Sequence, residues 1–419
     1  MARKWHTRSF LSSSGDAIQG DFSYEDESRI FLARSAHAAK HLSRSYFTEN
    51  VPIEVHFHGI GHIDFSTNIE HLDLLAIQQF LSEEGILGIP TIFVSKSKLP
   101  HFLNLMQHFF LLKQEGTLPN ILGLALEGPI LLSNGGTPLE GSWTPMWQDW
   151  EKIAKCGPKG LKYMVISPDL NLNTLMPLAE LFLSNGVYLS LGHLRKESVP
   201  EAIEGILAVT EVAKKMGFAP HSGVISIDHF LNDMPRNIKH AWRSVSERRM
   251  RSRQLIDIDV DSWKMNTLEL QIGEVPALLI KLARKGIITL FLNFDGQHVD
   301  LHICRRLYEM VGADNIVAMT DRVETSTFGK AHLQKAEVGT LWYQKKGTVA
   351  AGSSTLDEQM TNMRALHIPE RDIWKMCAQN AARIFKSNES STLKNTFLSY
   401  IHSRNLRIGL EVNKSFTLK

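Results

Sequence analysis

The sequence has few cysteines, no long apolar run and almost no net charge. Its three cysteines, Cys156, Cys304 and Cys377, are odd in number and far apart, which argues against a disulfide framework and a cysteine-based metal site. No apolar run approaches the roughly 20 residues that span a bilayer, and the start MARKWHTRSFLSSSGDA lacks the apolar core of a signal peptide. We therefore expect a cytoplasmic protein without a membrane partner.

The charge balance also narrows the choice of partners. A formal net charge of +2 over 419 residues is too small to predict a nucleic-acid partner for the whole chain. Hydrophobic residues make up 43% and charged residues 21%, which is a globular composition. The length suits one large domain or two ordinary ones. Histidine, by contrast, occurs 18 times and is the residue type that directs the search for a site.

Short apolar runs alternate with longer stretches of helical periodicity, such as 71–85 and 300–312, which end in glycine. Eight runs read as buried parallel strands: 51–59, 88–96, 121–128, 161–168, 187–193, 223–230, 287–296 and 315–321. This number and this alternation predict an α/β fold, a TIM-like (β/α)8 barrel.

Catalytic residues of such barrels lie at the carboxyl ends of the strands. Metal-ligating or proton-carrying side chains stand at six of the eight predicted ends: His56 and His58, Glu127, His193, His229, Asp295 with His298, and Asp321. Because alternate residues of a strand face the same side, His56 and His58 can both point into the barrel mouth. By itself, an HxH motif such as that in EVHFHGIGHIDFS (54–66) belongs more often to a polar surface loop than to a metal site, and its place at the end of the first strand favours the metal site.

These side chains suit a divalent ion such as zinc, which lowers the pKa of water and polarises a carbonyl. Glu127, His193 and His229 can converge on one ion. Asp321 has no metal-binding residue beside it in the sequence, so we predict that it acts as general base and then as general acid. The alternative is that Asp321 caps the helix that follows. The implied reaction is metal-assisted hydrolysis of an amide or a related bond.

The same stretches, in the same order, resemble the amidohydrolase superfamily and more closely its N-acetylglucosamine-6-phosphate deacetylase family. The resemblance covers roughly residues 50–386. Its blocks are HFHGIGHIDFS (56–66), GIPTIF (88–93), LALEGPIL (124–131), ISPDL (166–170), SLGHLRKES (190–198), DHFLNDM (228–234), FDGQHVD (294–300), MTD (319–321) and VAAGSSTL (349–356), followed by CAQNAARIF (377–385).

The resemblance implies roles for individual residues. It assigns one ion to Glu127, His193 and His229, a second to His56 and His58, and catalysis to Asp321. It assigns substrate contacts to Asn232 and His298, and to the small-residue loop with Gly352 and Ser353. It implies an N-acetylated amino sugar, with or without a phosphate, as substrate, and a homodimer as the assembly.

Four departures from the family lie within the predicted barrel. Trp143 stands where the family has a carbonyl-polarising histidine, and Asp233 stands in the place of the alanine of the N-A-M block, where an acid beside a phosphate is unfavourable. Arg322 follows the catalytic aspartate. An insertion near 235–268 is basic between 236 and 253, which is typical of a solvated face but also compatible with an anion or a second subunit.

The flanks complete the predicted organisation. Residues 1–50 form an N-terminal extension with a helix-like stretch at 25–47, residues 51–386 form the barrel, and residues 387–419 form a tail. The small β domain of the family is then reduced or rebuilt from the termini. Two other functions stay open: hydrolysis of a different amide, and a barrel that keeps its metal but only binds sugar.

Overall fold

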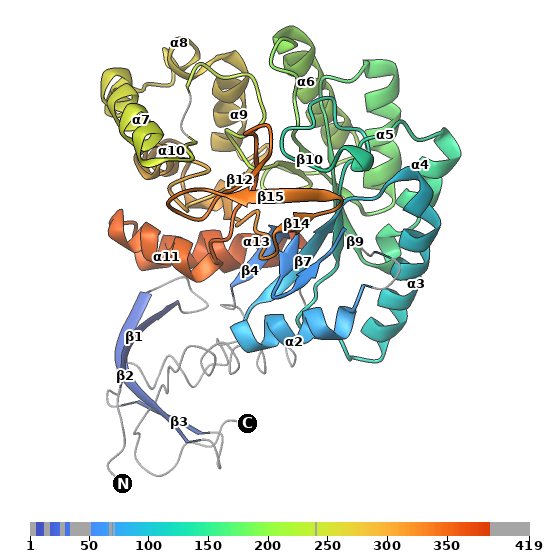
Figure 1. Cartoon of the computed structure of the whole chain (residues 1–419), viewed down its shortest axis with the longest axis horizontal. Coiled ribbons are helices and arrows are strands. Elements are labelled where there is room, and N and C mark those ends of the chain that lie inside the picture. Colours follow the sequence, from blue (N-terminus) through green and yellow to red (C-terminus); the bar gives the residue numbers. More distant parts are fainter. Residues whose placement is uncertain are drawn as a thin grey trace.

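A computed structural model describes residues 52–66, 69, 72–238 and 241–385, together with the backbone of three strands near the N-terminus (Figure 1). Eight parallel strands form one sheet in the order β13-β12-β11-β10-β9-β8-β7-β4. Their bounds are β4 (Ile53–Phe57), β7 (Leu87–Ile92), β8 (Leu124–Glu127), β9 (Leu161–Ile166), β10 (Tyr188–Leu191), β11 (Ile225–Ile227), β12 (Thr289–Leu292) and β13 (Ile316–Ala318). Seven of them lie within a predicted run and β7 begins one residue before its run, so the predicted barrel is confirmed.

A helix follows each strand and covers the outside of the barrel (Figure 1). These helices are α2 (Leu74–Glu84), α3 (Leu99–Gln114), α4 (Trp147–Ala154), α5 (Leu172–Ser184), α6 (Val199–Lys215), α9 (Glu274–Arg284), α10 (Leu301–Val311) and α11 (Leu356–Ala365). Local signals define their ends. Asp73 caps α2 by accepting a hydrogen bond from the Ala76 amide, and Gly85 ends it in a left-handed conformation with φ of 67°.

The barrel closes between its first and last strands just beyond β13. The backbone of Phe57 pairs with that of Arg322, and the amide of His58 donates to the carbonyl of Arg322 at 2.8 Å. The amide of Asp321 donates to the carbonyl of His56 at 3.0 Å. This closure brings the ends of β4 and β13 side by side, so His56, His58 and Asp321 become neighbours.

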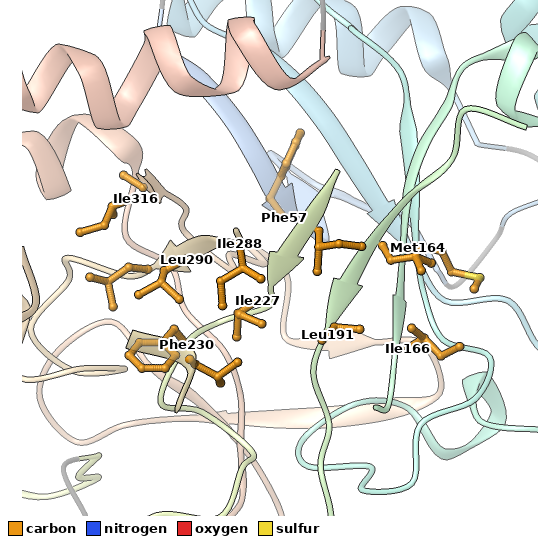
Figure 2. Packing of buried hydrophobic residues seen from close by; sticks show 14 of the residues in the cluster. Phe57, Met164, Ile166, Leu191, Ile227, Phe230, Ile288, Leu290 and Ile316 are labelled. Atoms are coloured by element: carbon orange, nitrogen blue, oxygen red, sulfur yellow. The ribbon is translucent and has the colours of Figure 1, made fainter. Parts of the chain in front are cut away.

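Two apolar layers hold the barrel together. An outer layer between strands and helices includes Phe57, Met164, Ile166, Leu191 and Ile316 (Figure 2). An inner layer joins residues from strands around the whole barrel, such as Val55, Tyr163, Phe291 and Val317, together with Ala381, Ile384 and Phe385 of α13 (Asn380–Phe385). The alternation of inward and outward side chains along each strand produces these two layers.

Two antiparallel sheets accompany the barrel. One contains β1 (His6–Leu11), β2 (Ala17–Glu25) and β3 (Ile30–Ala33); the other contains β14 (Thr327–Phe328), β15 (Ala331–Lys335), β16 (Trp342–Gln344) and β17 (Val349–Ala351). The predicted helix-like stretch at 25–47 is therefore wrong at residues 30–33, where antiparallel pairing with β2 overrides the local pattern. Residues 34–51 and the predicted tail at 387–419 lie outside the described residues.

The predicted insertion adds helices between β11 and α9. They are α7 (Val245–Ile258) and α8 (Leu268–Ile272). Two further elements lie elsewhere: a short hairpin of β5 (Gly59–Ile60) and β6 (Ile63–Asp64) follows β4, and the helix α12 (Glu370–Trp374) precedes α13. None of the helices in the described part of the chain is long and apolar enough to cross a bilayer.

Candidate metal centre

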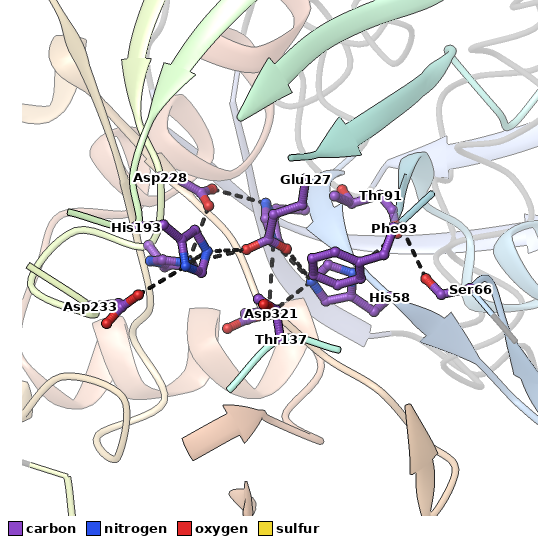
Figure 3. Close-up of polar contacts among 12 residues, drawn as sticks. His58, Ser66, Thr91, Phe93, Glu127, Thr137, His193, Asp228, Asp233 and Asp321 are labelled. Carbon is purple, nitrogen blue, oxygen red and sulfur yellow. Dashed lines mark hydrogen bonds and ion pairs between the residues drawn. The ribbon is translucent and has the colours of Figure 1, made fainter. Parts of the chain in front are cut away.

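The predicted site residues meet at the carboxyl ends of the strands, where Figure 3 shows their side chains facing one another. Six of them are almost completely buried, none being more than 7% exposed: His56, His58, Glu127, His193, His229 and Asp321. Buried polar and charged groups need partners, since an unpaired one is costly. Here the partners are mostly one another, in two adjoining clusters.

The first cluster consists of Glu127, His193, Asp228 and His229, whose ligand atoms all lie within 4.8 Å of one another. The Oε1 atom of Glu127 contacts Nε2 of His193 and lies 3.4 Å from Nε2 of His229. The two histidine Nε2 atoms are 3.1 Å apart. Two imidazoles and two carboxylates form a donor set that suits a divalent transition ion.

The second cluster consists of His56, His58 and Asp321, again within 4.8 Å. Nε2 of His58 lies 3.1 Å from Nε2 of His56 and 3.3 Å from Oδ1 of Asp321. Asp321 thus has three histidines beside it in space, His56, His58 and His298, although none is beside it in the sequence. No helix begins after Asp321, since β14 comes next, so the alternative role as a helix cap is wrong.

Glu127 joins the two clusters. Its Oε1 faces His193 and His229, whereas its Oε2 lies 3.0 Å from Nε2 of His58 and 3.4 Å from Nε2 of His56. A carboxylate with one oxygen in each cluster is arranged as a bridging ligand would be. The segment at 54–66 therefore contributes one of two clusters, not a complete site.

Asp228 is a site residue that the sequence analysis did not single out. It is completely buried, with Oδ1 2.9 Å from Nδ1 of His56 and Oδ2 3.2 Å from Nε2 of His229. Neither oxygen accepts a hydrogen bond of good geometry. The available signal was its position, since the apolar run GVISIDHF places an aspartate directly before the candidate ligand His229.

Backbone and hydroxyl groups orient the histidines of the second cluster. Nδ1 of His58 lies 3.1 Å from the carbonyl of Thr91, which leaves Nε2 free to act as a ligand. The Tyr163 hydroxyl lies 3.2 Å from Nδ1 of His56 and donates to the carbonyl of Val55 at 2.7 Å. The rings of Phe93 and Phe328 pack against His58, at centroid distances of 4.9 Å and 4.8 Å.

Mutual interactions shift the pKa values of the clustered groups. Burial disfavours the charged form of each, but the hydrogen bonds of His193 to Asp233 and then Glu127 raise its pKa well above its ordinary value. The same His193 contact lowers the pKa of Glu127 well below its usual range despite burial. In Asp321, too, burial raises the pKa, but the hydrogen bond from His58 together with the charges of His298 and His56 lowers it below its ordinary value. The carboxylates are therefore poised in their ionised form, which is the form that binds a metal ion.

The backbone is strained at several of these positions. Positive φ angles, rare for residues other than glycine, occur at His193 (56°), His229 (21°), Asp233 (40°) and Asp321 (49°). Such conformations cost about 1–3 kcal/mol each and persist where the surrounding structure enforces them, commonly at functional sites. The strained residues thus follow the strand ends at which side chains from separate strands meet.

The donor set fits a divalent ion. Several buried ligand-type atoms make no hydrogen bond of good geometry within the described residues: Oε2 of Glu127, both carboxylate oxygens of Asp228, Nδ1 of His229 and Nε2 of His298. Such groups are normally satisfied in folded proteins. A cation among the two clusters would satisfy the carboxylate oxygens.

The predicted substrate-binding residues surround this centre. His298 lies with Nε2 3.5 Å from Oδ2 of Asp321, and its Nδ1 is 2.6 Å from Asp295, which also accepts backbone amides in the turn. Nδ2 of Asn232 is a buried donor that finds no hydrogen-bond acceptor among the described residues. A Cβ atom on Gly352 would lie 2.8 Å from Cε1 of His298, so only glycine fits this contact.

Four other residues named from the sequence already have polar partners within the protein, which limits their contacts with a substrate. The Ser353 hydroxyl donates to the carbonyl of Thr340 at 2.9 Å. Asp233 lies 2.9 Å from Nδ1 of His193. The indole of Trp143 donates to the carbonyl of Val94 at 2.7 Å, so its single donor is already used. Arg322 is buried, and its guanidinium forms two hydrogen bonds to the carboxylate of Glu84.

The basic insertion uses several of its arginines locally. Arg243 pairs with Glu247 at 2.7 Å, the guanidinium of Arg248 lies over the ring of Trp242, and Arg251 donates to Gln254 at 2.8 Å. These contacts support the interpretation of this stretch as a solvated face. They leave the proposed anion or subunit contact without a supporting observation.

Solved structures of N-acetylglucosamine-6-phosphate deacetylases have a similar fold. The enzyme from Thermotoga maritima aligns with a TM-score of 0.61 at 16% identity, over 90% of this chain and 88% of that chain. The enzyme from Pasteurella multocida aligns with a TM-score of 0.56 at 16% identity, over 80% and 76%. For a Mycobacterium smegmatis variant in complex with N-acetyl-D-glucosamine-6-phosphate the values are 0.53, 16%, 80% and 77%.

No protein-family profile matches this sequence, and no curated protein sequence matches it either. At this identity the structural likeness establishes the fold alone. The chain thus has a TIM-like barrel similar in fold to these deacetylases, with two buried His and carboxylate clusters at the carboxyl ends of its strands.

Proposed function

We propose that this protein is a zinc-dependent amidohydrolase that removes the N-acetyl group from an amino sugar, such as N-acetylglucosamine 6-phosphate or a related sugar. The observation that carries the proposal is the pair of buried clusters joined by Glu127, with Asp321 at their edge. The similar fold of deacetylases that act on this sugar supports the substrate class.

Glu127, His193 and His229 would hold the first ion, and His56 and His58 would support a second one. A divalent ion at such a centre lowers the pKa of a water molecule and polarises a carbonyl oxygen. Asp228 places one carboxylate oxygen beside a histidine of each cluster and adds negative charge that favours a cation.

Asp321 is the proposed proton carrier. Its carboxylate takes a proton from the attacking water, a new C–O bond forms at the acyl carbon, and the C–N bond breaks. Asp321 then delivers that proton to the departing amine, so that the products are a carboxylate and an amino sugar. His298, held by Asp295, and Asn232 orient the sugar, while Gly352 and Ser353 line it.

Purified protein tests this proposal directly. Zinc content should be measured by elemental analysis, and acetate release should be followed on N-acetylglucosamine 6-phosphate and a panel of other N-acetylated sugars. We expect bound zinc, turnover of at least one sugar, and loss of turnover on chelation that zinc restores. Bound zinc without deacetylation of any sugar would contradict the proposal and favour another amide substrate or a sugar-binding barrel.

A further inference from the structure

The Asp233 carboxylate lies against a candidate metal ligand rather than pointing into open space. Its Oδ2 is 2.9 Å from Nδ1 of His193 (Figure 3). Its Oδ1 accepts a hydrogen bond of 2.8 Å from the hydroxyl of Ser133. Both carboxylate oxygens are therefore engaged. In the family that the sequence resembles, an alanine occupies this position, so this contact is a property of this chain.

The loops that carry these three residues are tied to one another. The amide of Leu194 donates to the carbonyl of Asp233 at 3.0 Å, and the amide of Ser133 donates to the carbonyl of His193 at 3.0 Å. The hydroxyl of Ser167 also donates to the carbonyl of His193, at 2.8 Å. The ends of β8, β10 and β11 thus hold Ser133, His193 and Asp233 in one fixed arrangement.

The space around Asp233 is also tight. A Cβ atom on Gly135 would lie only 2.9 Å from Oδ2 of Asp233, so the loop after β8 approaches the carboxylate closely. The Asp233 side chain is 13% exposed, and the side chain of His193 is 2% exposed. The carboxylate has little freedom to leave His193.

This contact has a consequence for the two ring nitrogens of His193. Nδ1 faces two acceptors, Oδ2 of Asp233 at 2.9 Å and the carbonyl of Ser133 at 3.0 Å, so it carries the proton. When the second proton leaves to make way for an ion, Nε2 is then the nitrogen with the lone pair, and it lies on the side of Glu127 and His229. A carboxylate on the far nitrogen fixes the tautomer and the orientation of a metal-binding histidine and makes it a stronger ligand.

We propose that Asp233, held by Ser133, is a positioning residue that locks His193 in the tautomer and orientation required to bind a divalent ion. This inference rests on the proposed function, because it assigns His193 to the metal. It moves Asp233 from the substrate side, where the sequence placed it, to the support of the metal ligand.

The test compares zinc affinity among four variants of the full chain. Asp233→Ala removes the acceptor, Asp233→Asn keeps an acceptor oxygen without the charge, and Ser133→Ala removes the hydroxyl that holds the carboxylate. Asp261→Asn is the matched control, because Asp261 forms a similar contact with His302 at 2.9 Å on an exposed surface. Zinc affinity is measured by competition with a chromophoric chelator, and the ligand field is read from the absorption spectrum of the cobalt-substituted protein.

We expect Asp233→Ala to weaken zinc binding by on the order of 10- to 100-fold and to change the cobalt spectrum. Asp233→Asn should recover part of the loss, Ser133→Ala should show a smaller loss, and Asp261→Asn should match the wild type. If Asp233→Ala does not fold, as judged by circular dichroism, Ser133→Ala decides by the same two measurements.

Two outcomes separate this inference from the proposed function. If the wild type binds no zinc or cobalt, the proposed metal-dependent function fails and the inference fails with it. If the wild type binds zinc while the Asp233 and Ser133 variants keep its affinity and cobalt spectrum, only the positioning role is overturned. A loss in Asp233→Ala that Asp233→Asn does not recover at all would also overturn it.

Discussion

Nε2 of His58 lies 3.0 Å from Oε2 of Glu127, although β7 separates their strands in the barrel. The other carboxylate oxygen of Glu127 contacts His193, on the opposite side of the centre. One side chain therefore connects ligand clusters that come from distant parts of the sequence. We therefore expect a substitution of Glu127 to affect metal binding at both clusters.

Glu127→Gln is expected to weaken zinc binding at both clusters, because an amide cannot offer an anionic oxygen to each of them. His58→Ala should weaken only the second cluster, since His58 belongs to that one. Zinc titration followed by calorimetry measures the number of zinc sites and the affinity of each. His62→Ala is the control, an exposed histidine of the same segment. Unchanged zinc binding in Glu127→Gln would refute the bridging role.

Asp321→Asn should lower kcat by about 10²- to 10⁴-fold, the usual contribution of a general acid and base. The first cluster keeps all its residues in this variant, so the zinc bound by that cluster should stay close to the wild-type amount. Steady-state kinetics and elemental analysis on the same preparation measure both effects. Full activity in Asp321→Asn would show that another group carries the proton.

Zinc affinity is expected to fall as the pH is lowered. Burial opposes protonation, but Asp233 and Glu127 raise the pKa of His193 well above its ordinary value, and Asp228 does the same for His56. Without a metal ion these rings bind protons, which must leave before the nitrogens can coordinate. Chelator competition at several pH values between about 6 and 8 measures the dependence. An affinity independent of pH would contradict it.

The wild-type protein should become less stable as Glu54 ionises with rising pH, and Glu54→Gln should not show this decrease. Burial raises the pKa of Glu54 to about 7, despite the charge of Arg322. The folded state therefore holds the proton more tightly than the unfolded state, so folding becomes less favourable as the pH rises from about 4.5 to about 7. The full effect corresponds to roughly 3 kcal/mol.

Denaturant unfolding of Glu54→Gln and of the wild type at pH values across this window tests the effect of Glu54. The difference in unfolding free energy should grow in favour of the variant as the pH rises. Glu197→Gln, at an exposed glutamate, is the control. A difference that stays constant with pH would show that Glu54 is ionised in the folded protein throughout.

Trp143→Phe tests whether the indole takes part in catalysis. Because the indole already donates to the carbonyl of Val94 at 2.7 Å, we expect a stability loss of roughly 1 kcal/mol from the lost hydrogen bond and little change in kcat. Trp147→Phe, at an exposed indole that donates to Glu151, is the matched control for stability. A large fall in kcat would assign Trp143 a role in polarising the substrate carbonyl.

Local sequence patterns predicted the barrel and the kinds of side chain at its catalytic end. Buried parallel strands are encoded by short apolar runs and their helices by a different period, so eight repeats of the alternation were sufficient. The clustering of His56, His58, Glu127, His193 and His229 followed, because all carboxyl ends meet on one face. At residues 30–33 the local helical pattern misled, since pairing with β2 depends on contacts outside the segment.

The sequence by itself thus determined the fold and the ligand types, because both depend on periodicity and strand ends. Only the tertiary structure decided which atoms meet: that Glu127 joins both clusters, that Asp321 lies beside His58, and that Asp228 and Asp233 face histidines rather than substrate. These contacts depend on barrel closure and on strained backbone at the strand ends, which bring together residues far apart in the chain.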